Sequence, residues 1–214
     1  AAGTSARLTS APAGVDSIIT LTSMNGGTDA ETDDELLTRL LNVLRQPPAG
    51  GNANDYKVWA ESVDGVATAW VYPLRRGLGT VDVVITAHNG LPSAETLAAV
   101  QRHIDAVRPV TAKSCLVLAP TVITVDISVQ VGISDGVTLE AVSAAITHRL
   151  TAYFNALIPG QAAILTQIGA LISDVFGVLD YRVITPKTNT EPRVSASVIE
   201  WVRAGKITVR PLRE

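Results

Sequence analysis

A stripe of leucines at helical spacing is the first clear pattern along the chain. Thr32 and Glu35 precede it at the spacing of a capping box, and Gln46-Pro47-Pro48 ends it. We therefore predict a helix that begins at Thr32 and ends before Gln46. The stripe consists of Leu36, Leu37, Leu40, Leu41 and Leu44.

The next seventy residues change between helical and strand patterns. Helical stretches are bounded by capping residues and glycines, while the strand stretches are rich in β-branched and aromatic residues. We expect the first two strands to pair as a hairpin. The predicted elements are a helix after Gly50-Gly51-Asn52 that ends at Gly65, strands at 66–72 and 80–87, a helix that is capped by Ser93 and ends before Arg108, and a strand at 115–118.

The last hundred residues contain the cleanest alternation of apolar and polar positions, at 123–131. This alternation predicts a strand with one face toward water. Two helical patterns follow, and Gly177 is placed as the C-terminal cap of the second. The predicted elements are helices from Thr138 to Leu157 and from Thr166 to Val175, and strands at 178–184 and 206–210.

These patterns predict an α+β fold. We expect two small α/β sandwiches in tandem, each a mainly antiparallel sheet with helices packed on one face. The predicted domains are 31–119 and 120–214. Residues 1–30 are expected to form an extended arm with one strand at 17–23. Because the chain begins at Ala1 without a methionine, we expect that a segment upstream of it is missing.

Composition and charge exclude several classes of protein. The chain has 214 residues, 47% of them hydrophobic, so it can bury a core, and its net charge of −3 lacks the dense positive field that phosphate binding needs. We therefore expect no nucleic-acid partner. The most apolar stretch, 162–179, is interrupted by polar residues, so we also expect no membrane partner.

Acidic residues gather at positions 29–35, where a calcium loop is the alternative to a solvated helix start. A loop that began at Asp29 would place Asp34 where the turn needs glycine and Leu40 where a bidentate glutamate is needed. Carboxylates at a helix N-terminus are stabilised by the helix dipole. We therefore expect no metal there.

The residues that enzymes use are present but are not arranged in a known catalytic pattern. Gly77-Leu78-Gly79 begins like a dinucleotide fingerprint, but Asp82 occupies the position of the third glycine. His88, His103 and His148 fall in different predicted elements. The single cysteine, Cys115, has apolar neighbours, which favours a buried thiol; a dyad with a distant histidine remains the alternative. We expect no catalytic residue, no cofactor and no small-molecule substrate.

Two groups of basic residues are the candidate partner interface. Arg75 and Arg76 lie at the tip of the predicted hairpin, and Arg203 and Lys206 lie near the C-terminus. Solvated surface is the alternative for all four. Exposed charge steers association with an acidic protein partner, which is why we single them out.

The order of several short segments resembles the baseplate J-like family, the Mu-like baseplate wedge proteins of contractile-tailed phages and related tail machines. The resemblance covers about residues 1–210 and is most specific from Gly26 to Trp59. The segments are GGTDAETDDELLTRL at 26–40, PPAGGN at 47–52, DYKVWA at 55–60, VDGV at 63–66, GTVDV at 79–83 and RPV at 108–110.

The resemblance implies a structural virion protein with no catalytic residues. It also implies that the arm at 1–30 is the remnant of a missing N-terminal domain. It implies a wedge protein that assembles into a ring around a central hub and rearranges when the tail contracts. The implied partners are other baseplate wedge and hub proteins and further copies of itself, in the virion tail baseplate and, during assembly, in the host cytoplasm. The alternative is a cytosolic small-molecule-binding regulatory module with paired α+β domains, which would need a convergent polar pocket.

Overall fold

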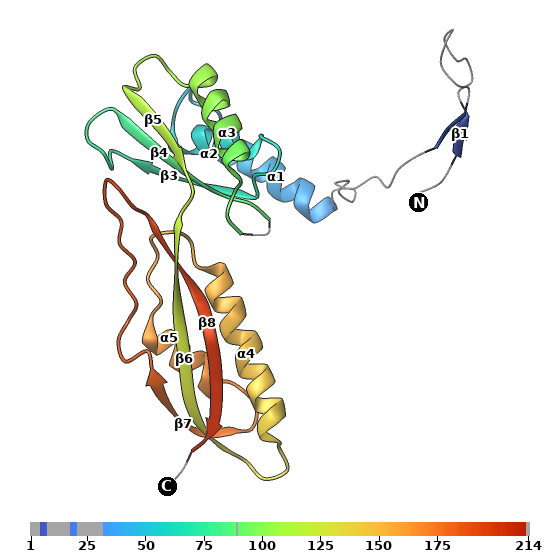
Figure 1. The fold of residues 1–214 in the computed structure, drawn as a ribbon, viewed down its shortest axis with the longest axis vertical. Coiled ribbons are helices and arrows are strands. Elements are labelled where there is room, and N and C mark those ends of the chain that lie inside the picture. Colours follow the sequence, from blue (N-terminus) through green and yellow to red (C-terminus); the bar gives the residue numbers. More distant parts are fainter. Residues whose placement is uncertain (1–4, 8–17, 21–31, 89, 213–214) are drawn as a thin grey trace. The chain divides into compact units, whose positions relative to one another are not determined.

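The computed structural model describes residues 5–7, 18–20, 32–88 and 90–212 (Figure 1). Within them the chain forms five helices and eight strands. It divides into two compact units, 1–47 and 48–214, and each unit is described by itself. The expected domain boundaries after residues 30 and 119 stay predictions.

The first unit contains a short strand pair and one helix. Strands β1 (Ser5–Arg7) and β2 (Ile18–Thr20) are antiparallel, and β2 is a shorter form of the strand expected at 17–23. Helix α1 (Asp33–Arg45) follows the leucine pattern, and the Leu36 nitrogen donates to the Thr32 carbonyl at 2.9 Å. The side chain of Glu35 lies outside the described residues, so the capping box stays a prediction.

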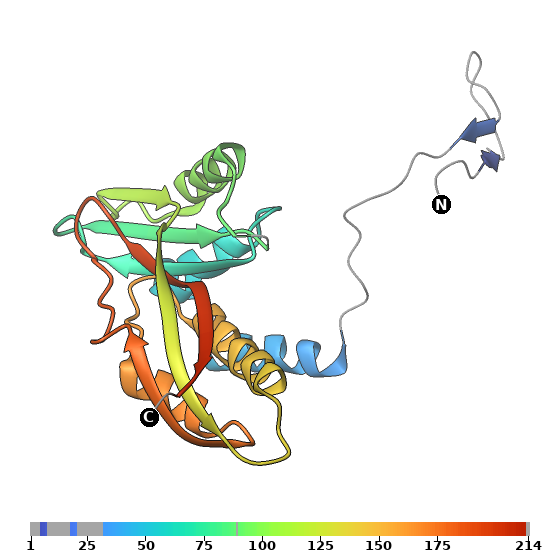
Figure 2. The same ribbon diagram turned by 60° about the horizontal axis from the view of Figure 1, so that its bottom comes forward.

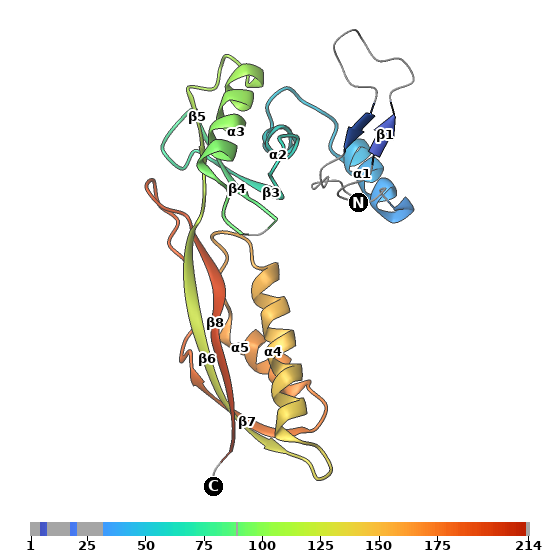
Figure 3. The same cartoon turned by 45° about the vertical axis from the view of Figure 1, so that its right-hand side comes forward.

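The second unit begins with a three-stranded sheet in the order β3-β4-β5. Helices α2 and α3 cover the same face of this sheet (Figure 3), and they share one core. The core is built from Tyr56 and Ala60 of α2, Val100 and Ile104 of α3, and Val83 and Ile85 of β4. The elements are α2 (Ala53–Glu61), β3 (Thr68–Pro73), β4 (Thr80–Thr86), α3 (Ala94–Val107) and β5 (Ser114–Leu118).

Helix α2 begins at a capping box whose acid is buried. The Asn52 side chain accepts from the Asp55 nitrogen, and the Asp55 carboxylate accepts from the backbone nitrogens of Gly51 at 2.6 Å, Ala49 at 3.1 Å and Asn52 at 3.1 Å. The bond from Gly51 contributes most to holding the pKa of Asp55 below its usual value. The predicted start of this helix is confirmed.

A second sheet, in the order β7-β6-β8, forms the rest of this unit. Helices α4 and α5 lie on one face of it (Figure 3), and their apolar side chains fill a core with Ile127, Val129 and Val131 of β6. Figure 2 shows the chain passing from β5 directly into β6. The elements are β6 (Thr121–Ile133), α4 (Leu139–Ala156), α5 (Leu165–Ser173), β7 (Val178–Thr185) and β8 (Glu200–Pro211).

The α+β class and the tandem sheets are as predicted, but both sheets are mixed rather than mainly antiparallel. In each sheet the central strand has one antiparallel and one parallel neighbour, because β4 is parallel to β5 and β6 is parallel to β8. Helix α3 crosses over between β4 and β5, and such a crossover returns the chain in the same direction.

Several boundaries also differ from the prediction, including the starts of β8 and α5. Strand β8 begins at Glu200, six residues before the predicted start at Lys206. Helix α5 begins at Leu165, with Ile164 as an N-cap that makes no side-chain bond, so Thr166 lies in the first turn and is not the cap. None of the described helices is long and apolar enough to cross a membrane.

Candidate functional site

A buried carboxylate holds both arginines of the β3–β4 turn. Asp82 on the central strand is completely buried, and its two oxygens accept from Arg75 Nε at 2.6 Å and Arg76 Nε at 2.7 Å. Arg76 also donates to Ser114 Oγ at 3.2 Å. Neither the partner contact nor the solvated surface expected for these arginines includes this structural role, which arises because a buried acid needs compensating charge. Their part in a partner contact stays a prediction.

The same turn joins the first sheet to the second. Arg75 donates to the carbonyl of Ser195, in the segment that leads into β8. Figure 2 shows this red-orange segment beside the turn between β3 and β4. Tyr72 donates from its hydroxyl to the carbonyl of Pro159 at 2.5 Å, and burial raises the pKa of Tyr72 to about 12. We call these contacts, together with the tryptophan pair described next, the seam.

Two tryptophans, one from each sheet, meet at the seam. Trp70 of β3 and Trp201 of β8 have ring centroids 6.4 Å apart. Trp201 is buried and donates from Nε1 to the Leu157 carbonyl at 2.6 Å, just after α4. These contacts connect the end of α4 with both sheets.

Arg203, expected at a partner interface, is engaged within the chain. Its guanidinium lies 4.3 Å from the Trp201 ring and donates to the Phe154 carbonyl at 3.1 Å and to Asn155 Oδ1 at 2.6 Å. A cation that bonds the last carbonyls of a helix also offsets the helix dipole. Burial lowers the pKa of Arg203. Lys206 differs, because its side chain is exposed and it is its backbone nitrogen that donates to Asp126.

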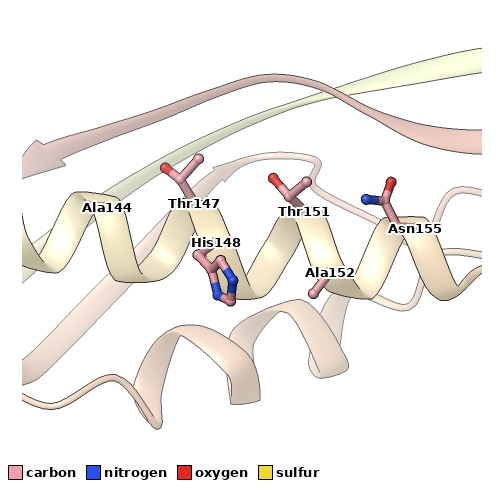
Figure 4. Close-up of a pocket in the computed structure, with 6 residues that line it drawn as sticks. All are labelled: Ala144, Thr147, His148, Thr151, Ala152 and Asn155. Carbon is pink, nitrogen blue, oxygen red and sulfur yellow. The ribbon is translucent and has the colours of Figure 1, made fainter. Parts of the chain in front are cut away.

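Two hollows are described in the second unit. One, of about 410 Å³, lies at the seam and is bordered by Trp70, Tyr72, Pro159 and Val194, among others. The other, of about 570 Å³, lies along α4. Figure 4 shows Thr147, Thr151 and Asn155 pointing to one side of this helix and His148 pointing to the other. Neither gathers the convergent polar side chains that the small-molecule alternative needs.

The residues considered for catalysis or metal binding are dispersed. Cys115 is buried, and desolvation raises its pKa to about 11, which leaves the thiol protonated and unreactive at neutral pH. Asp33 and Asp34 are exposed, whereas Asp29 and Glu31 lie outside the described residues. Among the described residues, no group of three or more histidine, cysteine or acidic side chains could hold a metal ion.

Sequence reasoning missed the buried acids. Asp82 stands between Val81 and Val83, and an acid inside an apolar strand pattern is a signal that it has a cationic partner. Glu200 is also buried, and its hydrogen bond with the Arg193 guanidinium is the main cause of its lowered pKa. No local pattern marks Glu200, because Arg193 lies seven residues away across an irregular loop.

Comparison with known families matches both sheets of the second unit. The Baseplate J-like central domain matches residues 48–119, and the Baseplate J-like protein C-terminal domain matches residues 125–210. The first match spans the sheet β3-β4-β5 with α2 and α3. The second spans most of the sheet β7-β6-β8 with α4 and α5.

Curated relatives extend the similarity toward the N-terminus. The chain is 32% identical over 205 residues to baseplate protein gp47 of Escherichia phage Mu, which covers 88% of this chain and 56% of that protein. It is 33% identical over 202 residues to the Mu-like prophage FluMu protein gp47 of Haemophilus influenzae, covering 89% of this chain and 56% of that protein. The chain thus spans little more than half the length of these relatives.

A solved structure shares the fold. A chain in the cryo-EM structure of the anti-feeding prophage baseplate superimposes with a TM-score of 0.56, at 13% identity, over 94% of this chain and 48% of that one. At this identity the likeness concerns the fold alone. The two family domains lie in order along one chain and the relatives match most of it, so this protein belongs to the baseplate J-like family.

Proposed function

We propose that this chain is a structural component of a contractile-tail baseplate. In this role it is a wedge protein that joins other wedge and hub proteins and further copies of itself in a ring around the hub. The carrying observation is that both baseplate J-like domains are matched in order, with a phage Mu baseplate protein 32% identical over most of the chain. The proposed location is the virion tail baseplate, with assembly in the host cytoplasm.

The seam supports a mechanical role. Tyr72 and Arg75 bond carbonyls of the segments that lead into and out of the second sheet, and Trp70 contacts Trp201 of β8. Because of these side-chain contacts, the two sheets of the second unit transmit force as one body. When the baseplate rearranges on contraction, this unit moves as a piece, and its surfaces exchange neighbours. In this proposal the chain acts through surfaces and catalyses no reaction.

Among the four basic residues expected at a partner contact, Lys206 and Arg76 are the ones we propose for it. Lys206 is exposed, and Arg76 keeps a quarter of its side chain exposed beyond its bond to Asp82. Arg75 and Arg203 are directed into the chain's own contacts. Charge reversal at Lys206 should therefore weaken copurification with neighbouring tail proteins, while the melting temperature should stay close to that of the wild type.

Localisation within the particle tests the proposed function. The gene is tagged in the strain that produces the tails, and purified particles are labelled with gold against the tag. We expect label at one end of each tail, and loss of mature tails when the gene is deleted. A tag on a tail-tube protein, which should label the whole length, is the control; particles without label and normal tails after deletion would contradict the proposal.

A further inference from the structure

The turn between β3 and β4 exposes the side chains of Leu74 and Leu78, and its backbone is strained at Leu74 but fixed by hydrogen bonds. Leu74 has a φ of 61°, and it is the one residue other than glycine with a positive φ among those the structure describes. A residue with a side chain rarely adopts this left-handed conformation, because it is sterically strained. Yet Leu74 is 56% exposed and Leu78 is 86% exposed, so neither gains much packing within the chain.

The backbone around these two leucines is fixed. The Leu74 nitrogen donates to the Thr80 carbonyl at 2.9 Å, and the Gly77 nitrogen donates to the Leu74 carbonyl at 3.0 Å. Asp82 holds Arg75 and Arg76 between the leucines. We call Leu74 and Leu78 the apolar turn. A rigid base that displays large apolar groups loses little entropy when a partner covers them.

A cationic rim surrounds the apolar turn. Arg75 and Arg76 carry two positive charges against the single charge of Asp82. The excess charge faces solvent through Arg76, whose side chain is 25% exposed, whereas that of Arg75 is 6% exposed. Lys113 adds another, because its backbone nitrogen bonds the Gly79 carbonyl at 2.9 Å and its side chain is exposed. The matching partner surface is therefore apolar with an acidic rim.

The same chain carries such a surface between α5 and β7. Phe176 is 88% exposed and Leu179 is 74% exposed, on either side of Gly177, and we call them the distal patch. Asp180 is exposed beside Leu179, and Asp135 is exposed next to Ser134, whose nitrogen bonds the Gly177 carbonyl at 2.9 Å. Asp174 is also exposed but pairs with Arg149, and Arg182 lies farther along β7.

The apolar turn and the distal patch lie at opposite ends of the second sheet. The turn contacts Ser195 near the end where Thr121 pairs with Glu200, whereas the patch adjoins the end where Gly132 pairs with Asp180. Strand β6 has 13 residues between these ends, which corresponds to about 40 Å. The two surfaces can therefore meet only between different chains.

We propose that the apolar turn of one copy docks on the distal patch of a second copy, so that neighbouring chains associate head to tail. Opposite rim charges orient the contact, and the leucines and Phe176 provide its apolar area. A contact between two different surfaces repeats from copy to copy and closes into a ring when the rotation allows. The inference rests on the proposed function, because it supplies the contact between copies.

Cross-linking at the rims tests the contact while leaving its apolar side chains in place. In a Cys115→Ala background, Lys113→Cys and Asp180→Cys are made in separate chains and oxidised alone and as a mixture. We expect a cross-linked dimer in the mixture and none with either variant alone. In the control, Thr151→Cys, at an exposed position on α4, takes the place of Asp180→Cys in the mixture. This pair should give only the cross-linking that arises from random collisions.

Two further variants separate the contact from folding. Leu78→Ser in the Lys113→Cys chain should abolish the cross-link without changing the melting temperature, while Val58→Ser, at a half-exposed position on α2, should not. Unlabelled chain without the added cysteines should compete for the contact and suppress the cross-link. Lys113→Glu in this competitor should lower its ability to suppress the cross-link about two- to fivefold.

Other outcomes would overturn the head-to-tail contact. Equal cross-linking by Lys113→Cys alone would show a two-fold contact instead. A mixture that gives no more product than the Thr151→Cys control would show that the two surfaces do not meet. Gold label at the tail end together with either result would leave the proposed function standing and remove only this contact.

Discussion

The carboxylate of Asp126 accepts a hydrogen bond of 2.7 Å from the backbone nitrogen of Lys206, across the pair of strands β6 and β8. The bond lies at a bulge, because Val125 pairs with Ala204 but Ile127 pairs with Ile207. Gly205 lies in this bulge. A Cβ there would overlap Asp126 Oδ1 and would stand 3.1 Å from the Val125 carbonyl oxygen.

Gly205→Ala should therefore destabilise the chain by about 1–3 kcal/mol, because the new methyl group displaces the carboxylate and its hydrogen bond. Urea denaturation measures the change. Gly132→Ala is the matched control, since its Cβ would meet nothing closer than 3.7 Å. In an Asp126→Ala background the cost of Gly205→Ala should shrink, and an unchanged cost would assign the strain to the backbone alone.

Asp82→Asn should destabilise the fold by about 3–5 kcal/mol, because it leaves the guanidiniums of Arg75 and Arg76 beside a neutral group in a buried site. Chemical denaturation with a circular dichroism signal measures the loss. Exposed Asp64→Asn is the control and should be nearly neutral. A midpoint equal to that of the wild type would mean that water, not Asp82, compensates the two arginines.

Reversal of both arginines should unfold the first sheet rather than leave it intact. Arg75→Glu with Arg76→Glu would place two more carboxylates against buried Asp82. Like charges at this distance repel strongly in a poorly solvated site. The exposed control Arg102→Glu on α3 should keep the wild-type melting temperature, and a folded double reversal would contradict the structural role of the turn arginines.

The helices were predictable because their signals are local. Ser93 and Thr138 each accept a bond from a backbone nitrogen three residues later, at 3.1 and 3.3 Å, as capping chemistry requires. The stripe on α4 buries Val142, Ile146, Leu150 and Phe154 at spacings of four. Caps and helical stripes depend on residues that are close in the sequence, so the sequence pattern alone predicts them.

The start of β8 and the chemistry of the seam depend on distant residues. Glu200 lies in a strand because it pairs with Thr121, which precedes it in the sequence by two helices and a strand. The Glu200 carboxylate is neutralised by Arg193. Trp201 reaches Trp70 across 131 positions of sequence. No periodicity reports such pairings, which is why the predicted strand began at Lys206 and the arginines of the turn were interpreted as surface charge.

Cys115 should make the chain less stable in alkali. Its pKa in the folded chain is about 11, whereas an unfolded cysteine ionises at about 8.5. Between these values the unfolded chain loses the proton and the folded chain keeps it, so the free energy of unfolding falls as pH rises. Urea midpoints at pH 8 and pH 9, the latter about one unit below the ordinary pKa of tyrosine, should show this fall.

Cys115→Ala is the control for the alkaline effect. It should lower stability at both pH values, because a buried thiol is replaced by a smaller methyl group. The additional loss between the two pH values should become smaller than in the wild type. An identical pH dependence in both proteins would show that another group is responsible.

Tyr72→Phe should loosen the seam while both sheets stay folded. The change removes the 2.5 Å bond from the Tyr72 hydroxyl and leaves the Pro159 carbonyl without it, at a cost of about 1–2 kcal/mol. Amide hydrogen exchange should speed up at Gly160, whose nitrogen donates to the Glu200 carbonyl at 2.8 Å beside the seam, and stay slow in the core of α4.

The matched control is Tyr56→Phe, since the Tyr56 hydroxyl is buried and finds no partner among the described residues. That change should be neutral or stabilising. If both variants exchange like the wild type at Gly160, the hydroxyl of Tyr72 does not hold the sheets together, and the tryptophan pair with the Arg75 bond must suffice.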